Sequence, residues 1–498
     1  MCRVTAHHGM LPACIADRVT SFLIDGQWVA AHGADRQVVV NPADGAVVTE
    51  IALADPTDID RAVHAARRAF PAFSAQPVAA RVALLERIRA ACQRHQSLMA
   101  GLVTLEMGAP TALAMDMHTA SSLIYLDDAC ATARSFAFTR QDGGTRLVHE
   151  AIGVCALIAP WNWPLNQIIT KLAPALGAGC TVVIKPSELS PLSALLLGRI
   201  MDEAGVPAGV VNIVNGTGPV AGACLAAHPQ VDMVSFTGST RAGIAVAQAA
   251  APTVKRVHQE LGGKSPAIIM PDADLPRAVA DVVARCTINS GQSCIASSRM
   301  LVPRALEARA LELAAAAMGR ITVGLPTARG TDIGPVTGVA QFDRVQGYIR
   351  TGMHEGARLL AGGPGRPDTL PPALQGGYYC RPTLFGDVRP DMRIAREEIF
   401  GPVLSVLAYD TVEDAVALAN DTVYGLAGYV YGTDAVQAER IATRIRAGRI
   451  FINNPPFDFH APFGGYRQSG NGRELGTHGL LEFLEVKAML GCMTEPVP

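Results

Sequence analysis

The alternation of short apolar runs with amphipathic or alanine-rich stretches, which begins at Gly153, is the feature that most constrains the fold of this chain. Runs rich in β-branched residues predict strands, and the stretches between them predict helices. We expect strands at Val154–Ile158, Thr181–Ile184, Val210–Val214 and Met233–Phe236, and helices at Leu165–Leu176, Pro191–Ala204, Pro219–Ala227 and Thr240–Ala250. Runs as apolar as Thr-Val-Val-Ile are typical of parallel strands covered on both faces. The pattern therefore predicts an α/β protein built from repeated βα units.

A second α/β region follows the first. Its expected elements are a helix at Leu275–Ile288 with Asp274 as the N-cap, strands at Arg299–Val302 and Val403–Leu407, and helices near Ala305–Met318, Val412–Asn420 and Ala435–Arg446. Ahead of the first region, Ile59–Phe70 and Ala80–His95 have a helical pattern, and Thr145–Glu150 has the pattern of one arm of a hairpin. A length of 498 residues agrees with roughly two to four domains.

Charge and composition narrow the class of partner. Forty-two basic and forty-four acidic residues give a formal charge of −2, and no block of like charges reaches five residues, which argues against nucleic acid or an acidic membrane surface. The amino end lacks the apolar core of a secretory signal, so we expect a cytoplasmic protein. The eleven cysteines form no C-x-x-C pairs at zinc spacing and His-Glu-x-x-His is absent, so reduced thiols and no metal are expected.

Four polar or glycine-rich loops follow closely on the predicted strands of the first region. They are Pro160-Trp161-Asn162, Lys185-Pro186-Ser187-Glu188, Gly216-Thr217-Gly218 and Thr237-Gly238-Ser239. Open α/β sheets bind ligands at the carboxyl ends of their strands, so we expect these loops to share one crevice. The alternative is that each βα unit simply needs turn residues at this position.

Two of these loops have features of a phosphate site. The spacing Gly216-x-Gly218-x-x-x-Gly222 resembles the dinucleotide fingerprint but has three residues, not two, before the last glycine. Gly238 and Ser239 stand at the start of a predicted helix, where free backbone N–H groups bind phosphate. A simple N-cap role for Ser239 is the alternative.

Lys185 and Glu188 indicate which dinucleotide would bind. The chain has only five lysines, and this one follows a buried strand. A carboxylate at this edge accepts hydrogen bonds from ribose hydroxyls and repels a 2′-phosphate, which favours NAD over NADP. The alternative for Lys185 and Glu188 is a surface ion pair.

One cysteine has the surroundings of a reactive thiol. Cys294 lies in the small-residue loop Asn-Ser-Gly-Gln-Ser-Cys-Ile-Ala-Ser-Ser-Arg, whereas Cys286 falls on an apolar stripe with helical spacing and is expected in the core. A free thiol is only a few per cent ionised at neutral pH, so a catalytic cysteine needs a base. Glu260, beside Gly262 and Gly263, is the candidate base; its alternative is a solvated acid at a strand end.

Six ordered motifs resemble the NAD(P)-dependent aldehyde dehydrogenase superfamily. They are P-W-N-W-P at 160–164, K-P-S-E at 185–188, F-T-G-S-T at 236–240, E-L-G-G-K at 260–264, G-Q-S-C at 291–294 and E-E-I-F-G-P at 397–402, and the closing stretch 462–474 resembles the family too. The resemblance runs from about Phe22 to about Met489. It implies a Rossmann-type cofactor domain at 18–124 and 146–262, an α/β catalytic domain at 263–468, and a small β oligomerisation extension at 125–145 and 476–495.

The resemblance also implies residue roles. Cys294 matches the nucleophile, Asn162 the oxyanion-hole donor, and Glu260 the base that activates water for thioester hydrolysis. The residues that match cofactor-binding positions are Ile158, Pro160, Trp161, Lys185, Glu188, Gly218, Gly222, Phe236, Gly238, Ser239, Glu398 and Phe400. Those expected around the aldehyde are Trp163, Asn166, Gln167, Thr170, Ser293, Ile295, Phe457 and Phe459.

The expected function is NAD-dependent oxidation of an aldehyde to a carboxylic acid by a homodimer or homotetramer. Phe457 and Phe459 favour an apolar or aromatic aldehyde, with simple packing under their loop as the alternative. Arg285 and Arg449 stay open as partners for a second carboxylate. Two other functions stay open: a CoA-acylating semialdehyde dehydrogenase, against which Glu260 argues, and a catalytically silent NAD-binding structural protein.

Overall fold

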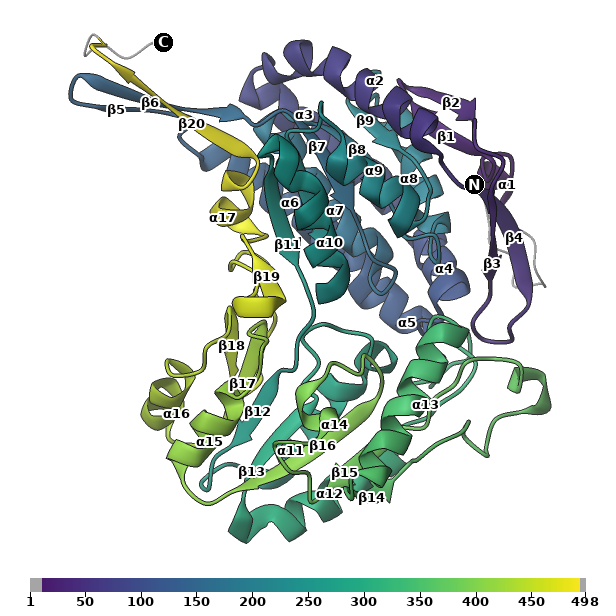
Figure 1. Ribbon diagram of the computed structural model, residues 1–498, viewed down its shortest axis with the longest axis vertical. Coiled ribbons are helices and arrows are strands. Elements are labelled where there is room, and N and C mark those ends of the chain that lie inside the picture. Colours follow the sequence, from purple (N-terminus) through teal and green to yellow (C-terminus); the bar gives the residue numbers. More distant parts are fainter. Residues whose placement is uncertain (1–10, 493–498) are drawn as a thin grey trace.

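Two large sheets organise the chain, which the computed structural model describes from residue 11 to residue 492 (Figure 1). The first sheet has the strand order β19 (Gly470–Asn471), β11 (Arg256–Glu260), β10 (Met233–Thr237), β7 (Val154–Ile158), β8 (Thr181–Lys185), β9 (Val211–Ile213), β1 (Ser21–Ile24) and β2 (Gln27–Ala30). The five strands from β11 to β9 are parallel, and those at the edges are antiparallel. All four expected strands of the first region are confirmed.

Both faces of this sheet are buried. Along β7, Val154, Ala156 and Ile158 belong to one core cluster, while Cys155 and Leu157 belong to another on the opposite face. The helices of this half are α1 (Ala13–Ala16), α2 (Pro56–Ser74), α3 (Val78–Arg94), α4 (Gln96–Met107), α5 (Thr111–Leu113), α6 (Ala120–Ser135), α7 (Pro164–Ala178), α8 (Leu192–Glu203), α9 (Ala223–Ala227) and α10 (Thr240–Ala250). Two π-helical segments, η1 (Ala114–Thr119) and η2 (Gly218–Gly222), and a short 3₁₀ turn, η3 (Ala251–Thr253), complete it.

The second sheet has seven strands. Their order is β14 (Arg358–Ala361), β15 (Thr383–Gly386), β16 (Val403–Tyr409), β13 (Arg299–Pro303), β12 (Pro266–Ile269), β17 (Ala427–Tyr431) and β18 (Arg449–Ile452). Its helices are α11 (Leu275–Thr287), α12 (Glu307–Gly319), α13 (Val339–His354), α14 (Arg393–Arg396), α15 (Val412–Asn420) and α16 (Ala435–Ala442). The short 3₁₀ turns are η4 (Ile288–Gly291), η5 (Arg304–Leu306), η6 (Pro372–Leu374) and η7 (Arg467–Ser469). Both sheets together confirm the expected α/β class.

Three expected helices differ clearly from the prediction. The one expected at Ile59–Phe70 is longer, because α2 runs from Pro56 to Ser74. The helix expected at Pro219–Ala227 begins as the π-helical segment η2, in which Thr217 caps the backbone N–H of Val220, and becomes α-helical at Ala223. The helix expected to reach Arg446 ends at Ala442, because Asn420 holds the backbone N–H of Arg446 and turns the chain into β18. Asp274 caps α11 as expected.

A three-stranded sheet projects from the body of the molecule (Figure 1). It pairs β20 (Leu484–Leu490), which follows α17 (Gly476–Leu481), with the hairpin of β5 (Thr139–Asp142) and β6 (Thr145–Ala151). The extension expected from residue 125 therefore begins later, because α6 continues to Ser135 and packs its apolar face into the core. Residues 493–495 of the expected extension lie outside the described residues.

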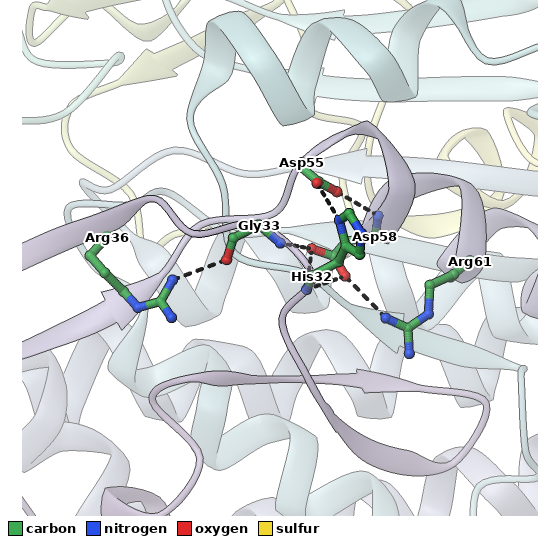
Figure 2. A network of polar contacts seen from close by, with 6 residues as sticks. All are labelled: His32, Gly33, Arg36, Asp55, Asp58 and Arg61. Carbon is green, nitrogen blue, oxygen red and sulfur yellow. Dashed lines mark hydrogen bonds and ion pairs between the residues drawn. The ribbon is translucent and has the colours of Figure 1, made fainter.

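A network of polar contacts ties the segment before the small hairpin β3 (Arg36–Val40) and β4 (Val47–Ala52) to the start of α2 (Figure 2). The fully buried carboxylate of Asp58 accepts hydrogen bonds from the backbone N–H groups of His32 and Gly33. Asp55 caps α2 through the N–H of Asp58 and also contacts the ring of His32 at 2.6 Å. One helix N-terminus thereby fixes a distant loop.

Two kinds of structure are absent from residues 11–492. No helix there has both the length and the apolar character needed to cross a membrane. No group of three or more His, Cys, Asp or Glu side chains in that range is arranged to hold a metal ion.

Candidate active site

The loop that carries Cys294 has a strained backbone. Asn289, Ser290 and Gly291 have φ angles of 55°, 57° and 75°, in the left-handed region that non-glycine residues seldom adopt. Side-chain hydrogen bonds hold this loop. Ser290 donates to the backbone carbonyl of Gly334 at 2.8 Å, and the side-chain amide of Gln292 donates to the backbone carbonyl of Asn289 at 3.0 Å. Strain of this kind persists only where surrounding contacts impose it, and it gathers at functional sites.

Asn162 is tied directly to this loop. Its Nδ2 donates to the carbonyl of Gln292 at 3.0 Å, and its own carbonyl accepts from Nδ2 of Asn289 at 2.8 Å. A side-chain amide has two N–H donors, so one remains for a ligand. The residue lies on the loop between β7 and α7 and is buried. Two segments 130 residues apart thus hold each other in place.

Glu260, the last residue of β11, is buried rather than solvated, in contrast to the alternative considered from the sequence. Burial, followed by the charge of Glu474, raises its pKa well above the ordinary value, while the charges of Lys171 and Arg473 lower it. Within residues 11–492 neither carboxylate oxygen makes a hydrogen bond. The neighbouring ring of His258 approaches to 3.5 Å, and burial keeps the pKa of that ring well below its usual range.

A buried ion pair acts on the charge of Glu260. Nζ of Lys171 on α7 donates to Oε1 of Glu474 at 2.5 Å, and both side chains are almost fully buried. Glu474 lines the cavity that contains Cys294, whereas Glu260 does not. The carboxylate of Glu260 is instead directed at Gly464, where an added Cβ would stand 2.7 Å from its Oε1.

Burial and three carboxylates act on the Cys294 thiol. Burial, then the charges of Glu398, Glu260 and Glu474, raise its pKa. Cys286, by contrast, is fully buried in the core below α11, as the sequence predicts. Only Cys294 among the ten cysteines in the described part of the chain lines the large cavity.

The four predicted loops do lie on one edge of the first sheet. The strands β10, β7, β8 and β9 are parallel neighbours in that order, so their carboxyl ends adjoin. The predicted cofactor residues lie at these carboxyl ends. Ile158 and Lys185 are the last residues of β7 and β8, and Pro160 and Trp161 follow β7. Phe236 is on β10, Gly238 and Ser239 lie just before α10, and Gly218 and Gly222 are the first and last residues of η2. Ser239 caps α10 by accepting from the N–H of Ala242, so its hydroxyl is engaged at that helix end.

Lys185 and Glu188 form an ion pair, but not a surface one. Nζ of Lys185 is 3.3 Å from Oε2 of Glu188, and it also donates to the carbonyls of Pro186 and Gly216. Lys185 is buried, and burial lowers its pKa. Glu188 is partly exposed at the crevice. The lysine therefore has a fixed position, with the carboxylate held beside it.

Glu398 comes to the crevice from the other half of the molecule. Its Oε1 accepts from the backbone N–H of Gly263 at 2.9 Å, and an added Cβ on Gly262 would collide with Oε2 at 2.4 Å. Burial raises the pKa of this carboxyl to about 7. Phe400 has a φ of 63° and stands edge-on to Trp161, with 5.4 Å between ring centroids. The glycines of E-L-G-G-K thus give Glu398 the room it occupies.

One cavity of about 720 Å³ contains all eight residues expected around the aldehyde, together with Cys294. One wall is a series of aromatic rings in contact, Tyr429, Phe451, Phe457, Phe459 and Tyr125, with centroid separations of 4.8–6.2 Å. Phe451 supports this wall from behind, and the other four rings line the cavity.

Polar lining residues of the cavity come from α7. Asn166 donates to Ser121 at 2.6 Å, and Thr170 donates to the carbonyl of Asn166. Gln167 lies beside them, and its Oε1 is buried with no hydrogen bond to any described residue. Trp163 stacks on the buried ring of His118 at 4.1 Å. The cavity therefore has one aromatic wall and polar lining residues that can form hydrogen bonds.

The two arginines left open by the sequence have different positions. Arg449 donates to the carbonyls of Ala461 and Pro462, and its guanidinium lies over Phe457 at 4.5 Å. It supports the loop that carries the aromatic residues and does not line the cavity. Arg285 on α11 does line it.

Several neighbours of the site were missed from the sequence. Lys171, Glu474, His258 and Asn289 surround the predicted catalytic residues. The scarcity of lysine was a signal for Lys171, because it is the only charged residue in a helix that is otherwise uncharged. The other three have no local pattern that distinguishes them.

Comparison with known proteins gives consistent results. The model of the "Aldehyde dehydrogenase family" matches residues 28–489. A 3-succinoylsemialdehyde-pyridine dehydrogenase of Pseudomonas sp. is 50% identical over 471 residues, covering 94% of this chain and 98% of that protein. The crystal structure of a mutant of aldehyde dehydrogenase C from Pseudomonas syringae, with NAD+ and octanal, has a TM-score of 0.95 at 50% identity and covers 97% of this chain and 99% of its own. A betaine aldehyde dehydrogenase from Staphylococcus aureus with NAD+ has a TM-score of 0.92 at 33% identity, covering 97% of each chain.

Proposed function

This chain belongs to the aldehyde dehydrogenase family, and on that premise we propose that Cys294, Asn162 and Glu260 are the residues with which it oxidises its aldehyde. NAD-dependent aldehyde oxidation follows from the family, and the assignment of the three residues is the proposal. The observation that supports it most is that Cys294 opens into the large cavity on a loop that Asn162 holds by hydrogen bonds in both directions.

Cys294 is the proposed nucleophile. Glu260 accepts the proton of the Cys294 thiol and passes it to solvent, and the sulfur forms a bond to the aldehyde carbon, whose C=O π electrons move to the aldehyde oxygen and leave negative charge there. The second N–H of Asn162 is the donor for that oxygen, and losing one such donor typically costs ~10²–10³ in turnover. Bound NAD supplies the hydride acceptor that the oxidation requires. The first stage ends with a thioester on Cys294.

Glu260 is the proposed base of the second stage. It takes a proton from a water molecule, the oxygen of that water attacks the thioester carbonyl, and the C–S bond breaks to release the acid and regenerate the thiol. A carboxylate with a raised pKa is a stronger base than an exposed one. Since Glu260 does not line the cavity and its Oε1 lies close to Gly464, we propose that it turns toward Cys294 or acts through water.

The residues along the shared edge fit a dinucleotide. Lys185 and Glu188 are the proposed ribose contacts at the adenosine end, and the start of α10 at Ser239 is the proposed pyrophosphate contact. Glu398 and Phe400 are the proposed contacts at the nicotinamide end. The Glu188 carboxylate would repel a 2′-phosphate, so we expect a higher kcat/KM with NAD than with NADP.

The experiment that tests this assignment combines two variants. Cys294→Ser is expected to abolish aldehyde-dependent NAD reduction. Glu260→Gln is expected to give one turnover and then accumulate the thioester, visible as an acyl adduct by intact-protein mass spectrometry. Steady turnover of Glu260→Gln at the wild-type rate would remove Glu260 from this role. Acyl-CoA formation when CoA is added would support the acylating reaction instead.

An apolar aldehyde is the proposed substrate class. The cavity is large and has the aromatic wall described above. Two proteins that are each 50% identical to this chain are named for, or crystallised with, an aldehyde that has an extended apolar part, an acyl-pyridine semialdehyde and octanal. A panel of aliphatic, aromatic and semialdehyde compounds, each with NAD and with NADP, would rank the substrates.

A homo-oligomer is proposed as the working form, with dimer and tetramer both open. The projecting sheet supports this proposal, because Val486 and Leu490 on β20 are 59% and 82% exposed. Exposed apolar side chains on a projecting strand are typical of an interface. The cytoplasmic location remains a prediction from the sequence.

A further inference from the structure

Arg285 places a cation on the wall of the aldehyde cavity. Asp281, Ala284, Arg285 and Ile288 line the cavity, and their spacing puts them on one face of α11 and its end. Ile288 leads into the loop of Cys294, so this face runs away from the catalytic end at about 1.5 Å per residue. Arg285 lies roughly one helical turn before Ile288, where α11 gives way to the loop of Cys294.

Asn454 fixes the position of this guanidinium. Nε of Arg285 donates to Oδ1 of Asn454 at 2.7 Å, and Nη2 donates to the same oxygen. The plane lies over the rings of Tyr429 and Phe451, at 5.1 and 5.0 Å from their centroids. A planar guanidinium held by an amide and two rings is pre-organised, so little side-chain entropy is lost when it binds a ligand.

Every group seen in contact with Arg285 is neutral. Asp281, four residues earlier on α11, has the spacing of a helical ion pair, yet among residues 11–492 no ion pair to Arg285 forms. The amide of Asn454 takes Nε–H and one N–H of Nη2, the side-on pair of donors, and leaves the other N–H groups of the guanidinium for a ligand. Arg285 thus presents a charged donor toward the ligand cavity without an anion bound to it.

The charges around the cavity determine which ligand group suits this donor. Asp281 and Asp116 also line the cavity, and Glu474 at its inner end is already paired with Lys171. With two carboxylates lining the same cavity as one guanidinium, a carboxylate on the ligand is repelled as well as attracted. A neutral acceptor, such as a ketone oxygen, gains the hydrogen bond without the repulsion.

We propose that Arg285 and Asn454 form a subsite that selects aldehydes carrying a neutral hydrogen-bond acceptor on the apolar part of the molecule, several atoms from the reacting carbon. This inference rests on the proposed function, because it assigns the outer part of the same cavity. Unsubstituted apolar aldehydes bind the aromatic wall alone, and acceptor-bearing ones gain one charge-assisted hydrogen bond. Bonds to charged donors are worth about a tenfold to hundredfold preference.

The test compares octanal with oxo-octanals that carry a ketone at the fourth, fifth or sixth carbon, and with an aldehyde of similar length that ends in a carboxylate. For each compound kcat/KM is measured with saturating NAD. Wild-type protein is expected to prefer at least one oxo-octanal over octanal by about tenfold or more. Arg285→Met is expected to bring that ratio close to one, and Arg285→Lys, which keeps the charge but not the planar fork, to an intermediate value.

Arg277→Met is the matched control. Arg277 lies two turns earlier on α11, is exposed and does not line the cavity, so this variant should keep the wild-type ratio. The subsite is refuted if the ratio of kcat/KM for the oxo-octanals to kcat/KM for octanal is near one in wild-type protein, or if this ratio is unchanged in Arg285→Met. It is also refuted if Arg285→Met lowers kcat/KM equally for all compounds, because an equal loss indicates a structural role. A clear preference for the carboxylate compound refutes the neutral acceptor. If wild-type protein oxidises none of the aldehydes, the proposed function fails, and the subsite falls with it.

Discussion

At the scale of single residues, the basicity of Glu260 depends on charges from distant parts of the chain. Glu474 raises the pKa of Glu260, and Lys171 lowers it, although these two residues pair with each other. A general base works only when it is deprotonated, so activity is lost as pH falls through its pKa. The two partners should therefore move the acid limb of the pH profile in opposite directions.

The first prediction uses this opposition. Lys171→Met removes a positive charge, raises the pKa of Glu260 and should move the acid limb of kcat to higher pH, by about one pH unit. Glu474→Gln removes a negative charge and should move the limb to lower pH. Arg309→Gln, an exposed pair member on α12, is the control and should leave the limb in place. Shifts in the same direction for both variants would show that folding, rather than charge, is responsible.

The residue-scale assignments came from the sequence to different extents. Cys294 could be selected among eleven cysteines because its neighbours are small and polar. Asn162 could be selected because it lies in P-W-N-W-P, one of the six motifs that occur in the order typical of the family. His258 and Asn289 could not, because a buried histidine on a strand and an asparagine in a turn have no local pattern that distinguishes a supporting role.

At the scale of elements, single glycines decide whether the nucleophile loop can form. Gly291 has a φ of 75°, and an added Cβ would stand 2.1 Å from the backbone of Gly401. Gly347, inside α13, has nothing within 4 Å of such a Cβ. The same substitution should therefore have opposite effects at the two positions.

The second prediction follows. Gly291→Ala should lower kcat by at least an order of magnitude and reduce thermal stability, because the backbone of the loop has to move. Gly347→Ala should raise the free energy of unfolding by about 0.5–1 kcal/mol, since alanine is the better helix former. Thermal melts and steady-state kinetics of both variants check this. A wild-type rate in Gly291→Ala would contradict the strained loop.

The start of α2 carries the third prediction. Asp58→Ala leaves the backbone N–H groups of His32 and Gly33 without their buried acceptor, and should lower the free energy of unfolding by about 2–3 kcal/mol. Arg36→Ala, which removes one exposed side-chain donor from the same network, is the control and should change it by less than about 0.5 kcal/mol. Equal effects would mean that the Asp58 contacts are not the ones that stabilise this loop (Figure 2).

Most elements could be predicted because their cause is local. Strands β7, β8 and β10 and helices α7, α10 and α11 lie within a few residues of the ranges expected from hydrophobic periodicity. The π-helical start at Gly218 and the early end of α16 could not, because hydrogen bonds from Thr217 and from the distant Asn420 decide them.

At the scale of the whole molecule, the projecting sheet is the part that supports the proposed oligomer. Val486 and Leu490 expose apolar side chains on β20, whereas Lys487 of the same strand pairs with Glu150 on the neighbouring strand β6. An apolar strand on an isolated projection gains stability when a second copy covers it.

The fourth prediction concerns this surface. The double variant Val486→Asp and Leu490→Asp should dissociate the oligomer, because two charges would be buried at the interface. Analytical ultracentrifugation measures the mass, and circular dichroism checks that each subunit stays folded. Lys487→Gln is the control on the same strand. An unchanged mass in the double variant would exclude β20 as the interface.

The sequence by itself determined the order of the motifs, most of the secondary structure and the family, because these depend on residue types at short spacing. Only the tertiary structure decided how the site is assembled. Asn162 meets the nucleophile loop across 130 residues, Arg285 meets Asn454 across 169, and Lys171 meets Glu474 across 303. Contacts of such separation depend on how two sheets and their loops pack, and no periodicity in the chain encodes them. The basicity of Glu260 and the polar subsite at Arg285 are for this reason properties of the fold.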